Sequence, residues 1–141
     1  MTQKKQNKAL LLCAILLLLA VFAFTLLYGM FSPQPAEGDK AIQIQVVNDK
    51  QQSTDYQIHT DASYLRQALE ETDGLTFSGT EGAYGLMIET VNGITADWEQ
   101  NQAWWSIYVN DELANYGVDN QPVADGDRFR LQYTTEANAE R

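Results

Sequence analysis

The side chains that could carry out acid–base or nucleophilic chemistry are few in this sequence. His59 is the single histidine, and the single cysteine, Cys13, lies inside a long apolar run. Catalysis by a nucleophile and a base near neutral pH needs a partner for the histidine, and Cys13 is out of its reach. A lone histidine beside Thr60 and Asp61 is more often a hydrogen-bonding surface residue. The sequence therefore predicts no catalytic site and a protein that is not an enzyme.

Oxygen ligands for a metal ion occur near the C-terminus, but their spacing is not that of a metal site. Asp125 and Asp127 flank Gly126, and Asp119 and Asn120 lie just upstream. Calcium takes six to eight oxygen ligands, and the alternating acids ending in a glutamate that form a calcium loop are missing. Zinc sites built from clustered cysteines are excluded as well. We interpret Asp125-Gly126-Asp127 as a turn and predict no metal site.

Aromatic side chains point more directly to binding. Five of them fall in predicted loops or on a strand face predicted to point outward: Tyr84, Trp98, Trp104, Tyr108 and Tyr116. Aromatic rings with a polar tip are enriched at recognition surfaces, because the ring buries area while the tip keeps a hydrogen bond. The alternative is core packing, since a helix over that face would bury Trp104 and Tyr108.

Two strands near the C-terminus must position these aromatics. Strict alternation from Trp104 to Val109 predicts a strand, and Asn110-Asp111 predicts a tight reversal before residues 112–116. Asp125-Gly126-Asp127 opens the last strand. The predicted core faces carry Trp105, Ile107 and Val109 in one strand and Phe129, Leu131 and Tyr133 in the other. The opposite faces carry Trp104, Ser106 and Tyr108, and Arg128, Arg130 and Gln132.

The preceding residues predict a hairpin and a helix. Residues 42–47 and 54–59 alternate on either side of a predicted turn. Thr60 and Asp61 are the predicted N-caps of a helix that ends at Glu71. Its apolar side carries Tyr64, Leu65, Ala68 and Leu69.

Further strands follow this helix. Residues 75–82 and 84–91 are predicted strands, Asn92-Gly93 is a strong hairpin signal, and residues 97–102 are predicted to form a loop. The order of elements predicts an α+β fold, in which one helix covers a small, β-grasp-like mixed sheet.

An apolar run without charge or proline covers residues 9–31. At 1.5 Å per residue, a helix of this length crosses a hydrocarbon layer of about 30 Å. Basic residues precede the run and acidic residues follow it, so the positive-inside rule predicts a cytoplasmic tail at 1–8 and an extracellular remainder. A cleaved signal peptide is the alternative, although its apolar region is usually about 7–15 residues and no good cleavage site follows this run.

We therefore expect a single-pass protein of the cell membrane, with residues 9–31 as a transmembrane anchor or uncleaved signal. Pro33, Pro35 and Gly38 predict a linker over residues 32–39. One domain is expected at 40–135, followed by a tail at 136–141.

Charge and cysteine content restrict the partners of this domain. After the apolar run the chain carries six basic and 19 acidic residues, a net charge of −13. Such a surface repels phosphates, so no nucleic-acid partner is expected. The predicted exported part contains no cysteine, so disulfides are excluded there and the fold must depend on its core.

The C-terminal motifs resemble the bacterial transcobalamin-like C-terminal domain family. The resemblance rests on the stretch Trp104-Trp105-Ser106-Ile107-Tyr108-Val109-Asn110, on Gly117, on Val123 to Phe129 with its Asp-Gly-Asp turn, and on Tyr133. It extends upstream through residues 65–69, 84–88 and 91–93, so it covers roughly the final two thirds of the chain. Asp111 stands where the family usually has glycine, and aspartate also tolerates positive φ.

The resemblance implies a ligand-binding module, because in transcobalamin and intrinsic factor this small β-rich domain closes over one face of cobalamin. Cobalamin or a related corrinoid is the implied ligand, captured for uptake, and no resident cofactor is expected. By position, Trp104, Trp105 and Tyr108 with the loop through Tyr116 and Gly117 would form the contact edge. The helical barrel of the animal proteins is absent, so a membrane transporter is the expected partner. The alternative is a structural or adhesive surface domain that contacts another protein, a glycan or the cell wall.

Overall fold

The computed structural model describes residues 2–31 and 38–139. The chain forms two compact units, residues 1–34 and residues 35–141, and each is described by itself. Most of the predicted linker, and the last two residues of the predicted tail, lie outside the described residues.

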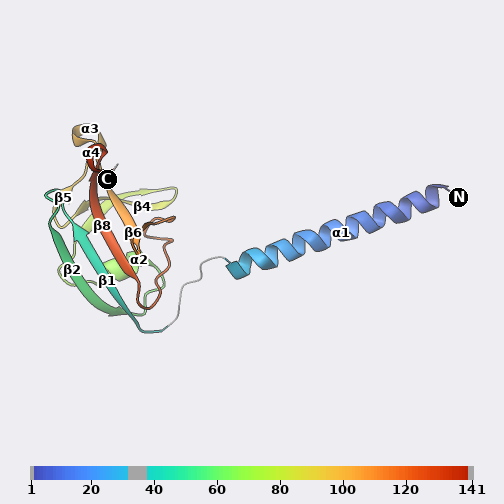
Figure 1. Cartoon of the computed structure of the whole chain (residues 1–141), viewed down its shortest axis with the longest axis horizontal. Coiled ribbons are helices and arrows are strands. Elements are labelled where there is room, and N and C mark those ends of the chain that lie inside the picture. The colour runs from blue at the N-terminus through green and yellow to red at the C-terminus, as the bar shows by residue number, and fades with distance from the viewer. Residues whose placement is uncertain (1, 32–37, 140–141) are drawn as a thin grey trace. The chain divides into compact units, whose positions relative to one another are not determined.

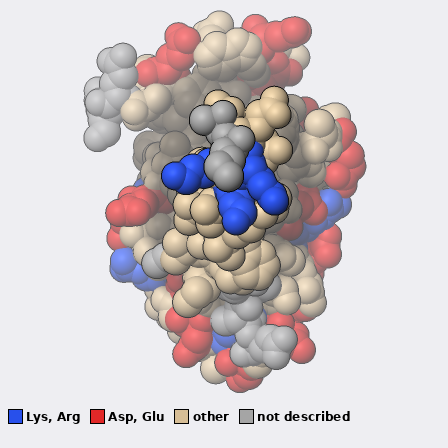
Figure 2. Space-filling view, turned by 90° about the vertical axis from the view of Figure 1, so that its right-hand side faces the viewer, with Lys and Arg blue, Asp and Glu red and all other residues tan. Residues whose placement is uncertain are grey.

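The first unit is one helix, α1 (Thr2–Phe31). Its stretch Gln3–Met30 is long and apolar enough to cross a membrane, and none of its most apolar part is buried within the structure. Figure 2 shows basic side chains gathered at the N-terminal end of this helix, whereas acidic side chains are spread over the second unit. The N-terminal apolar helix is thus established, and both a signal anchor and a signal peptide have such a helix.

The second unit is built on a five-stranded sheet (Figure 1), in the order β2-β1-β8-β6-β7. Its strands are β1 (Lys40–Val47), β2 (Ser53–Thr60), β6 (Ala103–Val109), β7 (Glu112–Leu113) and β8 (Arg128–Thr135). The central pair β1 and β8 is parallel, and the other pairs are antiparallel. This mixed sheet confirms the predicted α+β fold.

A smaller sheet of β3 (Phe77–Gly82), β4 (Gly85–Val91) and β5 (Ile94–Thr95) completes the β structure. Asn92 and Gly93 join β4 to β5 with φ values of 49° and 81°, as the hairpin signal predicts. The described residues of this unit also form three short helices: α2 (Leu65–Glu70), α3 (Trp98–Asn101) and α4 (Glu136–Ala139).

One face of the five-stranded sheet packs into the core. Ile44 of β1, Phe129 and Leu131 of β8, and Leu65 and Leu69 of α2 are almost fully buried in one cluster. Burying an aliphatic or aromatic side chain of this size contributes roughly 1.5–3 kcal/mol, so the cluster dominates stability. The alternation of the strands dictates this face, because successive side chains of a strand point to opposite sides.

The helix is shorter than predicted, and its capping differs. Its N-cap is Tyr64, without a side-chain cap, so the prediction of Thr60 and Asp61 is wrong. The N–H groups of Leu65 and Arg66 instead donate to the carbonyls of Gln121 and Val118, both at 2.9 Å. Carbonyls of a distant loop thus satisfy the donors that a side chain usually satisfies.

The prediction of a loop over residues 97–102 is wrong, because these residues contain the helix α3. Asp97 caps this helix, because its carboxylate accepts hydrogen bonds from the N–H groups of Glu99 and Gln100 at 2.8 and 3.1 Å. Gln102 ends the helix with a left-handed backbone. The capping aspartate was a visible signal for this single turn.

Candidate functional site

An open hollow lies along β6 and the segment that follows β7, with a volume of about 360 Å³. It arises because β7 is only two residues long. After Leu113, one more backbone bond, from Ala114 N–H to the Ile107 carbonyl at 2.8 Å, holds the chain to β6 before it turns away. The lining residues are Trp104, Trp105, Ser106, Ile107, Leu113, Ala114, Asn115, Tyr116 and Gly117.

The hollow exposes an unpaired part of the β6 edge. Backbone groups alternate in direction along a strand, so the N–H and carbonyl of Trp105 point to the same edge as the carbonyl of Ile107. Within residues 38–139, no strand pairs with Trp105 on this edge. A backbone donor and acceptor are therefore available beside apolar side chains, as ligand sites require.

Trp104 and Trp98 form one end of this edge. Their rings lie 5.7 Å apart between centroids, tilted by 51°. Trp98, on α3, is 55% exposed, and Trp104 is half-buried on the outward face of β6. Thus α2 does not cover Trp104, because the helix packs with the core face of the sheet. The pair presents ring surface next to the hollow.

Trp105 has a different role. Its side chain is only 7% exposed and its ring meets Tyr133 edge-on at 5.6 Å. The indole Nε1–H donates to the Glu89 carbonyl at 3.1 Å, which ties β6 to β4. The predicted core face of Trp105 is thereby confirmed, and the residue offers its backbone to the hollow while its indole is held in the core.

The other predicted aromatics divide between the hollow and the sheet face. Tyr116, 44% exposed, lines the hollow together with Gly117. Tyr84, 90% exposed, occupies the β3–β4 turn, and a Cβ on Gly117 would lie 3.6 Å from its carbonyl oxygen. This turn therefore lies beside the loop after β7, and the two segments together form one rim of the hollow. Tyr108 lies apart from the hollow, on the outward sheet face beneath the Arg130 guanidinium, which is 4.2 Å from the ring centroid.

An arginine links the two segments that form this rim. Arg66 of α2 pairs with Glu81 at 2.6 Å, with Asp119 at 2.9 Å and with Glu70 at 3.3 Å. The hydrogen bond from Leu86 N–H to Asp119, at 2.6 Å, and the neighbouring Arg66 lower the pKa of the Asp119 carboxyl. The hydrogen bonds to Glu81 and Asp119 stabilise the charged guanidinium and so raise the pKa of Arg66. Arg66 and Glu70 are four residues apart, a local signal for a pair on a helix, whereas Glu81 and Asp119 are 15 and 53 residues away from Arg66 and have none.

The Asp-Gly-Asp motif is a structural turn. The Asp127 carboxylate accepts from Ala124 N–H and from the Asn110 side-chain amide, both at 2.9 Å. Asp125 accepts from Ala41 N–H at 2.8 Å. These bonds fasten the β6–β7 turn and the start of β1 to the start of β8. Within the described residues, no group of histidine, cysteine and acidic side chains is arranged to hold a metal ion.

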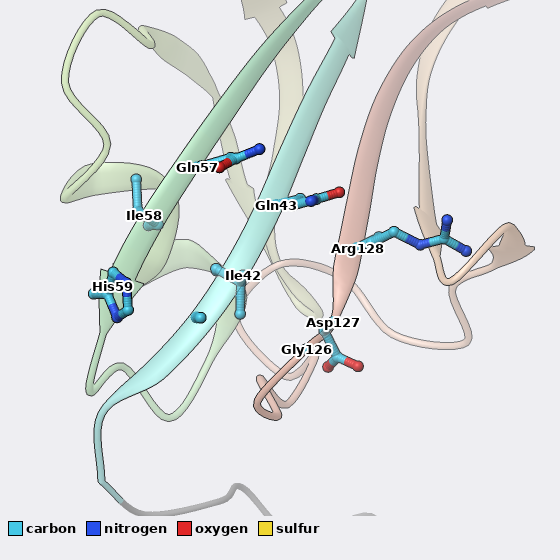
Figure 3. A pocket seen from close by; sticks show the side chains of 9 residues that line it. Ile42, Gln43, Gln57, Ile58, His59, Gly126, Asp127 and Arg128 are labelled. Atoms are coloured by element: carbon cyan, nitrogen blue, oxygen red, sulfur yellow. The ribbon is translucent and has the colours of Figure 1, made fainter.

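A second hollow, of about 370 Å³, lies between β1, β2 and the start of β8. Figure 3 shows Gln43, Gln57 and His59 around it, while the Arg128 side chain extends away. His59 faces Asp39 at 3.3 Å, and both are largely exposed. No phenylalanine, tyrosine or tryptophan side chain lines this hollow. It therefore lacks the tyrosine and tryptophan side chains that line the hollow beside β6.

Comparisons with known proteins agree with this fold. The sequence pattern of a family described as a domain of unknown function, DUF4430, matches residues 62–135. No curated protein matches the chain. A crystal structure of a proposed metal-binding protein from Ruminococcus gnavus ATCC 29149 is similar at a TM-score of 0.63 and 38% identity, over 68% of this chain and 97% of that chain.

Haptocorrin in complex with Cbi is similar at a TM-score of 0.53 and 15% identity, over 71% of this chain and 26% of haptocorrin. The chain thus spans about a quarter of that protein. At this identity the similarity is one of fold. The resemblance noted in the sequence is supported at this coarser level.

Proposed function

Because this chain belongs to the DUF4430 family, whose function is unknown, we propose a function from its site: an extracellular, membrane-anchored module that binds a small ligand beside β6. The hollow of about 360 Å³ carries this proposal, because it joins exposed rings to an unpaired backbone edge. Ligand sites combine apolar walls with a few polar groups in this way. Residues 9–31 would anchor the module, with the lysines before them in the cytoplasm.

For the ligand, we propose cobalamin or a related corrinoid. The fold similarity to haptocorrin in complex with Cbi supports this class. The hollow is open to solvent, so it would contact one edge or face of such a ligand. Because the chain spans only about a quarter of haptocorrin, the module alone should bind weakly. A transporter in the same membrane would complete the site and take up the ligand.

We propose no catalysis at this site. The residues that line the hollow include no histidine, cysteine or acid, so they offer no group that titrates near neutral pH. His59 lies at the other hollow and pairs with Asp39. Binding is therefore the role that the side chains support.

The test is a titration of the soluble fragment that begins at Gly38. This fragment contains the whole core, and the bacterial relative consists almost entirely of the matching part. Equilibrium dialysis against cobalamin and against cobinamide should show micromolar binding, accompanied by quenching of tryptophan fluorescence. Tyr116→Ala should weaken binding about tenfold, because it removes an aromatic contact of about 1–1.5 kcal/mol.

Tyr64→Ala is the matched control, since Tyr64 is 40% exposed, close to the 44% of Tyr116, and does not line the hollow. It should leave the affinity unchanged. A folded fragment that binds neither corrinoid at high micromolar concentration would contradict the proposal.

That negative result would favour the second candidate, a structural or adhesive surface domain. The unpaired β6 edge supports this alternative, because an exposed edge can accept an extended peptide as an additional strand.

A further inference from the structure

We infer that Arg66 is the positioning residue of the binding hollow: it holds the β3–β4 turn against the loop after β7, so that Tyr84 and Tyr116 form one rim. The inference rests on the proposed function for its effect on affinity. Its structural part is independent of any ligand, because it concerns how two surface segments are held.

The geometry of Arg66 supports this role. Its Nη1 lies 2.9 Å from Asp119 in the loop after β7, and its Nη2 lies 2.6 Å from Glu81 at the end of β3. These partners are 53 and 15 residues away in the sequence, so one guanidinium bridges two segments that do not otherwise share a strand ladder. The planar fork of arginine fits two carboxylates at once, which the ammonium of lysine does not.

Asp119 completes the link from the loop to the turn. Its Oδ1 accepts from Arg66, and its Oδ2 accepts from Leu86 N–H at 2.6 Å, at the start of β4. A Cβ on Gly85 would lie only 2.5 Å from Asp119 Oδ2, so the carboxylate fills the space that a side chain at this position would need. The turn that carries Tyr84 is thereby packed and hydrogen-bonded against the loop that begins at Gly117.

The backbone of α2 gives Arg66 a fixed base. Arg66 N–H donates to the Val118 carbonyl at 2.9 Å, and Val123 N–H donates to the Ser63 carbonyl at 3.0 Å. Residue 66 is therefore held to the loop through its own main-chain bond and through the bond at Ser63. Its side chain extends from this base to Glu81 of the hairpin, which the loop also contacts through the bond from Leu86 N–H to Asp119. Loss of the guanidinium should loosen the turn, which keeps the Leu86–Asp119 bond, without releasing α2.

The first experiment is hydrogen exchange by mass spectrometry on the fragment that begins at Gly38, without ligand. Arg66→Gln should accelerate exchange about tenfold in peptides covering residues 83–87 and 116–121, because the turn and the loop lose the charge-assisted hydrogen bonds of Arg66. Exchange in β1 and β8 should not change. Arg66→Lys should give an intermediate rate, since one of the two carboxylates can still be paired.

The control is Arg128→Gln, which removes an ion pair of 2.8 Å with Asp111 in the β6–β7 turn. It should leave exchange at both rim segments unchanged. Uniformly faster exchange in Arg66→Gln would show a general loss of stability, and unchanged exchange at the rim would show that Arg66 holds nothing. Either result overturns the inference.

The second experiment measures cobinamide affinity by equilibrium dialysis. Arg66→Gln should weaken binding several-fold although Arg66 does not line the hollow. If the wild-type fragment does not bind cobinamide, the proposed function fails, while the exchange experiment still decides the role of Arg66. If the wild type binds and Arg66→Gln binds equally well, the positioning role is refuted.

Discussion

Gly85→Ala should destabilise the domain more than Gly93→Ala, although the two glycines share a left-handed backbone, with φ values of 94° and 81°. A Cβ in this conformation costs about 1–2 kcal/mol. On Gly93 the Cβ would meet nothing within 4 Å, so Gly93→Ala isolates the backbone cost. On Gly85 it would lie 2.5 Å from Asp119 Oδ2 and 2.9 Å from Asp119 Cβ, so Asp119 must move.

The additional cost follows from the contacts of Asp119. Its displacement breaks the 2.6 Å bond from Leu86 N–H and the 2.9 Å pair with Arg66. A hydrogen bond to a charged group contributes about 1.5–3 kcal/mol, which the partial exposure of Asp119 reduces to about 1–2 kcal/mol. We therefore expect a loss of about 2–4 kcal/mol for Gly85→Ala, against about 1–2 kcal/mol for Gly93→Ala.

Urea unfolding of the fragment that begins at Gly38, monitored by tryptophan fluorescence, measures the loss in free energy of unfolding for both variants. Gly126→Ala is a second control, because its φ is 85° and its Cβ would also meet nothing within 4 Å. If Gly85→Ala and Gly93→Ala lose the same free energy of unfolding, the bonds of Asp119 to Leu86 and Arg66 contribute nothing measurable to stability. Our reasoning about the rim is then refuted.

Three further predictions concern stability. The pKa of Asp119 is lowered in the folded state, so its contribution is present above the unfolded pKa of 3.8 and is lost as the pH falls through the lower, folded value. Asp119→Asn should therefore flatten the acid limb of a stability–pH curve, and an unchanged limb would contradict this. Trp105→Phe should cost about 1–3 kcal/mol in urea unfolding, because the Glu89 carbonyl loses its donor and the ring leaves a cavity. Asp97→Ala should cost about 1 kcal/mol through loss of the α3 cap, and a neutral result would show that α3 contributes little.

Much of the fold could be predicted because the long strands β1 and β8 each have one buried face. The alternation of Phe129 and Leu131 with exposed or half-buried neighbours matches the burial along β8. Asn110 and Asp111 do adopt positive φ, at 51° and 71°, because short polar side chains tolerate this region. Such signals are local: they depend on residues a few positions apart and on side-chain chemistry alone.

The features that were missed depend on distant parts of the chain. The start of α2 is fixed by carbonyls of Val118 and Gln121, which no pattern near Leu65 could indicate. Four of the predicted contact residues, Trp104, Trp105, Tyr116 and Gly117, do line one hollow, and their role in binding stays a prediction. The sequence could not show that β7 would stop after two residues, and this early stop creates the hollow.

The central claim is that a corrinoid binds beside β6, and the chain's three tryptophans allow a direct test. In a ¹⁵N–¹H spectrum of the labelled fragment, cobalamin should shift the indole signals of Trp98 and Trp104 and the backbone amide of Trp105. The Trp105 indole should hardly move, because its N–H is bonded to the Glu89 carbonyl in the core. Shifts confined to the backbone amides around His59, or no shifts at saturating cobalamin, would contradict the account.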